Sequence, residues 1–92
     1  MSKKTVHVYI RGRVQGVFFR ANTKEQAEKQ GVQGWVRNMT DGRVEALFEG
    51  DARAVDAMVD WCHKGSPLSN VKEVKVQVLT TPVGCPDFKV KR

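Results

Sequence analysis

The sequence predicts a small α+β domain, with the element order βαββαβ, in which two helices cover one face of an antiparallel sheet. Several segments alternate apolar and polar residues with the period of two that is typical of strands with one buried face. Two further segments combine helix-forming residues with glycine or cap signals at their ends. The chain has 92 residues, 40% hydrophobic and 28% charged, which suits a single domain over residues 1–92.

The first two elements are a strand and a helix. Residues 6–11 alternate apolar and polar side chains, which predicts a strand. Asn22 with Glu25 three residues later resembles a capping pair, and residues 22–30 are rich in helix formers until Gly31. The sequence therefore predicts a helix that ends at Gly31 and begins at Asn22 or a few residues earlier.

A hairpin is predicted next. The strand-like runs 35–39 and 43–49 are separated by a short polar segment that contains Asp41 and Gly42. An Asp-Gly pair supplies the positive φ angles that a tight hairpin turn needs. Turn geometry alone therefore explains Asp41, and we do not expect it to act as a general base.

The last part of the chain predicts a helix and two strands. Asp51 is a suitable N-cap, residues 55–62 carry one apolar stripe at helical spacing, and Gly65 ends the helix. Residues 74–78 alternate like a strand, and residues 88–90 add a short edge strand after a turn-rich segment.

Charge and composition limit the classes of function. Sixteen Lys and Arg against ten Asp and Glu give a net charge of +6, which attracts phosphates of any kind, but no basic run marks a nucleic-acid tail. No stretch approaches the roughly 20 apolar residues of a membrane span, and no signal-peptide pattern is present, so we expect a cytoplasmic protein. Cys62 and Cys85 are expected to be free thiols, with neither zinc-site nor disulfide spacing.

Residues 12–20 link the first strand to the first helix and carry the chemistry. Gly12 and Gly16 let the backbone curl so that several N–H groups point inward, beside the positive end of a helix dipole. Arg20 adds a planar fork suited to two phosphate oxygens. The glycine spacing is not that of a Walker A loop, and Val14 stands where a cysteine phosphatase has its nucleophile. The segment alone fits either a phosphate site without a nucleophile or a turn that the glycines merely shape, with Arg20 at the surface.

This loop, followed by Gly34-Trp35-Val36-Arg37-Asn38 and then Asp41-Gly42, closely resembles the acylphosphatases over nearly the whole chain. The resemblance implies a ferredoxin-like sandwich with two helices on one face of an antiparallel sheet. It also implies catalytic roles for Arg20, which holds the phosphate, and Asn38, which positions the attacking water. The loop backbone that binds phosphate would comprise Val14, Gln15, Gly16, Val17, Phe18 and Phe19.

Two positions depart from the family pattern. Phe18 stands where some relatives have a cysteine, and Met39 stands where others have a threonine. Neither departure touches the roles of Arg20 and Asn38, but Met39 leaves the local hydrogen bonding around Asn38 open. The implied reaction is hydrolysis of a small acyl phosphate by a monomer, without metal or cofactor. A carboxylate is a stable leaving group, so general acid catalysis is hardly needed.

Two other functions fit the same element order. An RNA-recognition module would use Tyr9, Trp35 and Phe48 as a stacking platform, but the third-strand run 42–49 supplies one aromatic and two acids, so we do not expect nucleic acid as a partner. A regulatory module would hold an anion without turnover. His7 and His63 are expected at the surface, without a catalytic role.

Overall fold

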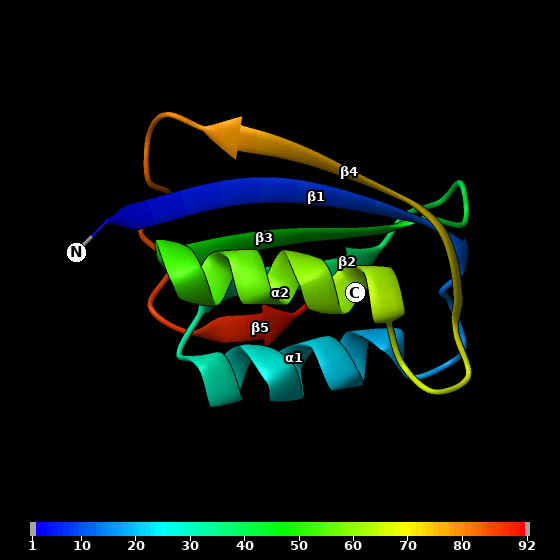
Figure 1. Cartoon of the computed structure of the whole chain (residues 1–92). Helices are drawn as coiled ribbons and strands as arrows, with labels where there is room; N and C mark the ends of the chain where they lie inside the picture. Colours follow the sequence, from blue (N-terminus) through cyan, green and yellow to red (C-terminus); the bar gives the residue numbers. More distant parts are fainter. Residues whose placement is uncertain (1, 92) are drawn as a thin grey trace.

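The computed structural model describes residues 2–91, in which two helices lie on the same side of a five-stranded sheet (Figure 1). The elements are β1 (Lys3–Arg13), α1 (Phe19–Gln30), β2 (Gln33–Asn38), β3 (Val44–Asp51), α2 (Ala52–Lys64), β4 (Asn70–Leu79) and β5 (Phe88–Val90). This order confirms the predicted βαββαβ arrangement and the ferredoxin-like fold, with β5 as the short edge strand.

The sheet has the strand order β4-β1-β3-β2-β5. Antiparallel pairs join β1 to both β3 and β4, and β2 to β3, whereas β5 runs parallel to β2. The sheet is therefore mixed at one edge instead of antiparallel throughout. The cause is the crossing segment 80–87, which carries the chain from the β4 edge to the opposite edge and delivers β5 in the same direction as β2.

The core lies between the helices and one face of the sheet. Alternate residues of the strands point into it, as the period of two predicts. The largest side chains with less than 2% exposure are Val6, Val8, Ile10, Val14, Phe19, Thr23, Val36, Val44, Phe48, Val55, Met58 and Cys62. Within residues 2–91, neither helix is long and apolar enough to cross a membrane.

Helix α1 begins at Phe19, a few residues before Asn22 as the prediction allowed, but the predicted cap is wrong. Its N-cap is Phe18, in the left-handed conformation (φ 63°, ψ 21°), with no side-chain cap. Asn22 is not a cap: it lies inside the helix, and its Nδ2 donates a hydrogen bond of 2.8 Å back to the Phe18 carbonyl. The backbone of the preceding loop therefore sets the start of α1, with the N-cap four residues earlier than the cap signal indicated.

The N-cap of α2 and the position of the β2–β3 hairpin are as predicted. Asp51 caps α2, since its carboxylate accepts a hydrogen bond of 3.0 Å from the Arg53 N–H. The hairpin forms between β2 and β3 as predicted, but among residues 2–91 Gly42 has a positive φ (94°) and Asp41 does not. Asp41 acts through its side chain, which accepts hydrogen bonds from the main chain and the guanidinium of Arg43. These bonds lower the pKa of Asp41.

Candidate active site

The register of β3 brings the two sequence motifs together. Val44, the first residue of β3, pairs with Ile10 near the end of β1 on one side and with Asn38, the last residue of β2, on the other. The loop that follows β1 and the end of β2 therefore meet at one end of the sheet. Asn38 shares a face with the buried Val36, so its side chain lies on the helix side, toward the start of α1.

The loop between β1 and α1 comprises residues 14–18. Val14 and Val17 are buried, and the Ser66 hydroxyl donates a hydrogen bond of 2.7 Å to the Val17 carbonyl, so the loop is fastened to the core. Gly16 has a φ of 73°, a conformation that glycine adopts at little cost. Such turns direct successive N–H groups toward one concavity.

Backbone donors are available in this loop. The N–H groups of residues 14–18 donate no hydrogen bond to another residue of the 2–91 segment, and the first turn of α1 contains no acidic residue. The N-terminus of a helix adds further unpaired N–H groups and the positive end of its dipole. Together these features suit a bound anion.

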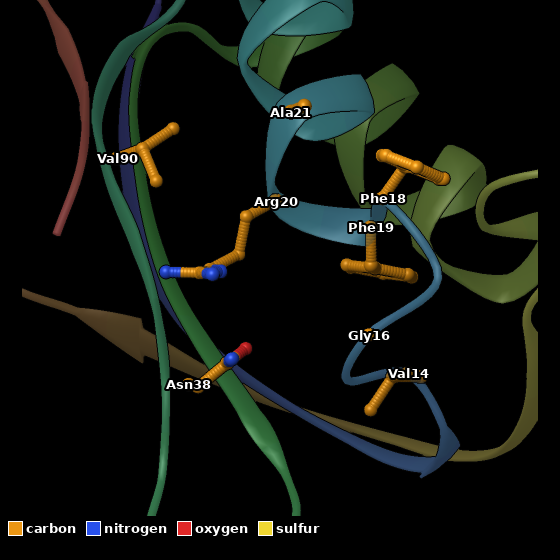
Figure 2. A pocket seen from close by; sticks show the side chains of 8 residues that line it. All are labelled: Val14, Gly16, Phe18, Phe19, Arg20, Ala21, Asn38 and Val90. Atoms are coloured by element: carbon orange, nitrogen blue, oxygen red, sulfur yellow. The ribbon is translucent and has the colours of Figure 1, made fainter. Parts of the chain in front are cut away.

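Arg20 and Asn38 face the same space from opposite sides (Figure 2). Arg20 extends from the first turn of α1, and its Nη1 donates a hydrogen bond of 3.2 Å to the Lys91 carbonyl, just beyond β5. Asn38 Oδ1 is buried and has no hydrogen-bond partner among the described residues. Buried polar atoms are normally paired, so an unpaired acceptor at this position favours a role toward substrate or water.

A cavity of about 330 Å³ lies between these groups, a volume that suits a small ligand. It is lined by Val14, Gly16, Phe18, Phe19, Arg20, Ala21, Asn38 and Val90. The two predicted residues that do not line it are Gln15, whose side chain turns toward the hairpin, and Val17, which packs in the core. Arg20 is the one ionisable residue in this lining.

Sequence reasoning missed Ala21 and Val90 as lining residues. Ala21 follows Arg20 directly, so its position was within reach of the loop motif. Val90 reaches the cavity because β5 pairs in register with β2, where Val90 lies opposite Val36. No local sequence signal fixes that pairing, since β5 has three residues and joins the sheet from the far edge.

The opposite face of the sheet carries a different cluster. His7 was expected at the surface, but it takes part in a cluster of polar contacts. Its Nε2 lies 2.6 Å from Glu45 Oε2, and Arg37 pairs with the other oxygen of this carboxylate. Burial opposes ionisation of Glu45, but the hydrogen bonds from Arg37 and His7 outweigh it and lower the pKa. His63 is exposed as predicted. Neither histidine lines the cavity.

The aromatic platform of the RNA-binding alternative is incomplete. Phe48 points into the core, so Tyr9 and Trp35 remain on the open face. Each ring already has a cation over it: the Arg43 guanidinium lies 5.0 Å from the Tyr9 ring centre, and the Lys91 ammonium lies 4.4 Å from the Trp35 ring centre. Stacked bases would have to displace these cations.

Two further features concern metal ligands and the two cysteines. His, Cys, Asp and Glu within residues 2–91 form no group of three or more that could hold a metal ion. Independence from metals stays a prediction for the assay. Cys62 is buried and Cys85 half-buried, and both are free thiols, as expected.

Comparisons with known proteins show which family the chain resembles. The family model described as Acylphosphatase matches residues 6–90. The chain is 56% identical to an acylphosphatase of Rubrobacter xylanophilus over 88 residues, covering 96% of this chain and 80% of the relative, and 50% identical to one of Haloquadratum walsbyi, covering 99% and 97%. The crystal structure of acylphosphatase from Bacillus subtilis superposes with a TM-score of 0.93 at 36% identity, covering 97% of this chain and 99% of that one.

Proposed function

Because this chain belongs to the acylphosphatase family, whose reaction is the hydrolysis of acyl phosphates, we propose that its loop amides and Arg20 bind the phosphoryl group while Asn38 orients the attacking water. The observation that carries the proposal is the position of the unpartnered Asn38 Oδ1 across one cavity from Arg20 and the loop N–H groups. The proposed site residues are those that the family resemblance implied.

The reaction has one displacement at phosphorus. The Asn38 Oδ1 accepts a hydrogen bond from the water and directs a lone pair of the water oxygen at phosphorus, opposite the leaving oxygen. The new P–O bond forms as the bond between phosphorus and the acyl oxygen breaks, and the electron pair leaves with the carboxylate. A phosphoryl oxygen of the substrate takes the proton of the water, so the products are a carboxylate and inorganic phosphate.

Charge stabilisation is the main contribution of the protein. Charge spreads over the equatorial phosphoryl oxygens in the transition state, and fixed N–H groups and a guanidinium stabilise it without reorganisation. The hydrogen bond from Arg20 Nη1 to the Lys91 carbonyl restrains the guanidinium, which supports this role. Because the leaving group is a carboxylate, the absence of an acid or a histidine from the cavity lining suits this substrate class better than a phosphate monoester.

The test follows hydrolysis of acetyl phosphate or benzoyl phosphate by the purified chain, with and without EDTA, and with a phosphate monoester as the control substrate. We expect turnover of the acyl phosphate that EDTA does not change. Arg20→Ala should lower kcat/KM by about a thousandfold or more and weaken inhibition by phosphate. Arg53→Ala, which changes an exposed arginine on α2, is the matched control and should have no effect.

Asn38→Ala tests the second role separately. We expect kcat to fall by roughly a hundredfold to a thousandfold while the inhibition constant of inorganic phosphate stays within about twofold. Turnover near the wild-type rate in Asn38→Ala would rule out water positioning by this residue. Phosphate binding without turnover by the folded wild type would favour the regulatory alternative.

A further inference from the structure

The side chain of Gln15 connects the phosphate-binding loop to the β2–β3 turn. Its Nε2 donates hydrogen bonds of 2.7 Å to the Met39 carbonyl and 2.9 Å to the Arg43 carbonyl. These two residues close the turn, since the Met39 N–H donates to the Arg43 carbonyl and the Gly42 N–H to the Met39 carbonyl. One amide group thus binds both ends of the turn, and the first of these ends directly follows Asn38.

The two partners of this contact are anchored unequally. The loop has its own attachments to the core through the buried Val14 and Val17 and through Ser66. The turn projects from the sheet, and its residues 40–42 are exposed. The side chain of Met39, which replaces a threonine of some relatives, offers no hydrogen-bond donor. The turn therefore depends on Gln15 for its position more than the loop does.

We propose that Gln15 is a positioning residue for hydrolysis: its side-chain amide holds the β2–β3 turn, and with it Asn38, at a fixed place relative to the phosphate-binding loop. This inference rests on the role proposed above for Asn38. It separates two functions of one residue, because the main chain of Gln15 belongs to the phosphate cradle while its side chain supports the water-binding side of the cavity.

Gln15→Met tests the inference, because methionine has a similar length but donates no hydrogen bond. The variant should fold, since the Met39 and Arg43 carbonyls each keep a main-chain partner within the turn. We expect kcat for the acyl phosphate to fall about tenfold to a hundredfold, as a displacement of about 1 Å would cause, with the inhibition constant of phosphate unchanged within about twofold. Gln77→Met, at an exposed position of β4, is the matched control.

The Asn38→Ala background shows through which residue Gln15 acts. If Gln15 works by positioning Asn38, adding Gln15→Met to Asn38→Ala should lower kcat no further. An equal fall of kcat in both backgrounds, or weaker phosphate binding in proportion to the loss of kcat, would place the effect in the loop and overturn the proposal. Wild-type kcat in Gln15→Met would also overturn it.

A second measurement does not depend on turnover. Hydrogen exchange of the Met39 amide should be at least about tenfold faster in folded Gln15→Met than in the wild type, because the turn that contains it is released. Unchanged exchange at Met39 contradicts the tether itself. Failure of the proposed function has a different signature, which is wild-type turnover in the single variant Asn38→Ala.

Discussion

Glu49 fastens the segment between β4 and β5 to the sheet, and its replacement by glutamine should destabilise the fold in a pH-dependent way. One carboxylate oxygen accepts hydrogen bonds from the N–H groups of Gly84 (2.8 Å) and Cys85 (3.1 Å). The other accepts from the Val83 N–H (2.6 Å) and the Thr5 hydroxyl (2.9 Å). The same segment leads into β5, and the carbonyl of Lys91 after β5 accepts a hydrogen bond from Arg20, so this anchor supports the candidate active site from a distance.

The size of the effect follows from the donor count. A hydrogen bond to a charged group contributes about 1.5–3 kcal/mol, and Glu49→Gln leaves one carbonyl oxygen while turning an NH₂ group toward N–H donors. We expect a loss of about 2 kcal/mol at pH 7, since the Thr5 hydroxyl can reverse its role and part of the site is open to water. For a domain of this size, such a loss lowers Tm by roughly 8–16 °C.

The pH dependence has a definite sign. Burial opposes ionisation of Glu49, but the hydrogen bonds from Val83, Thr5, Cys85 and Gly84 outweigh it, so the folded pKa lies below the ordinary value. A depressed pKa contributes stability that is full above the unfolded pKa of about 4.3 and is lost as the pH falls through the folded pKa. The difference between wild type and Glu49→Gln should therefore shrink below about pH 4.3.

Urea unfolding at pH 7 and pH 3, followed by circular dichroism, measures this difference. Glu28→Gln, at an exposed position of α1, is the control and should change stability by less than about 0.5 kcal/mol at either pH. The reasoning is refuted if Glu49→Gln loses nothing at pH 7, or if it loses the same free energy at pH 3 as at pH 7.

Three further predictions concern strain, packing and thiol reactivity. Phe18 is the non-glycine residue with positive φ within residues 2–91, and its side chain is 69% exposed. In urea unfolding, Phe18→Gly should therefore be about 1 kcal/mol more stable than Phe18→Ala. Equal stability of the two variants would argue against backbone strain at this position. Met58 is fully buried, and Met58→Ala should cost about 2–5 kcal/mol in the same assay, whereas a loss under 1 kcal/mol would mean that the core closes around the site. Burial raises the pKa of the Cys62 thiol, and burial together with the charge of Glu49 raises the pKa of the Cys85 thiol. Because Cys85 is partly exposed and Cys62 is buried, a thiol reagent at pH 8 should modify Cys85 in the folded chain and Cys62 only on unfolding. Rapid modification of folded Cys85→Ser would contradict this prediction.

The sequence allowed most of the fold to be predicted, because the strands have one buried face and alternate cleanly. Two features escaped prediction for physical reasons. The start of α1 is set by the left-handed backbone at Phe18, and sequence rules for helix starts depend on side-chain caps such as the one wrongly expected at Asn22. The parallel pairing of β5 depends on how the chain crosses the whole sheet, which a three-residue segment does not specify.

One part of the candidate site could be predicted from the sequence, and another part could not. Arg20 and Asn38 could be predicted from the two motifs and the family resemblance, and the structure brings them to one cavity. Val90 and the carbonyl of Lys91 could not, because their contributions depend on the register of an edge strand and on a main-chain atom that every residue possesses. Residue identity carries no signal for such a contact.

The second motif bears on a strand register as well as on the proposed role of Asn38. Gly34 lies in β2 with a φ of 141°, and a Cβ built on it would lie 1.7 Å from the Leu47 carbonyl of β3, so only glycine permits this close approach. Because side chains alternate along a strand, a slip of β2 by one residue would turn Asn38 to the open face and bring Trp35 toward the core. Gly34 thus contributes to the candidate site through the backbone: the close approach that it permits supports the pairing that leaves Asn38 on the same side of the sheet as Arg20.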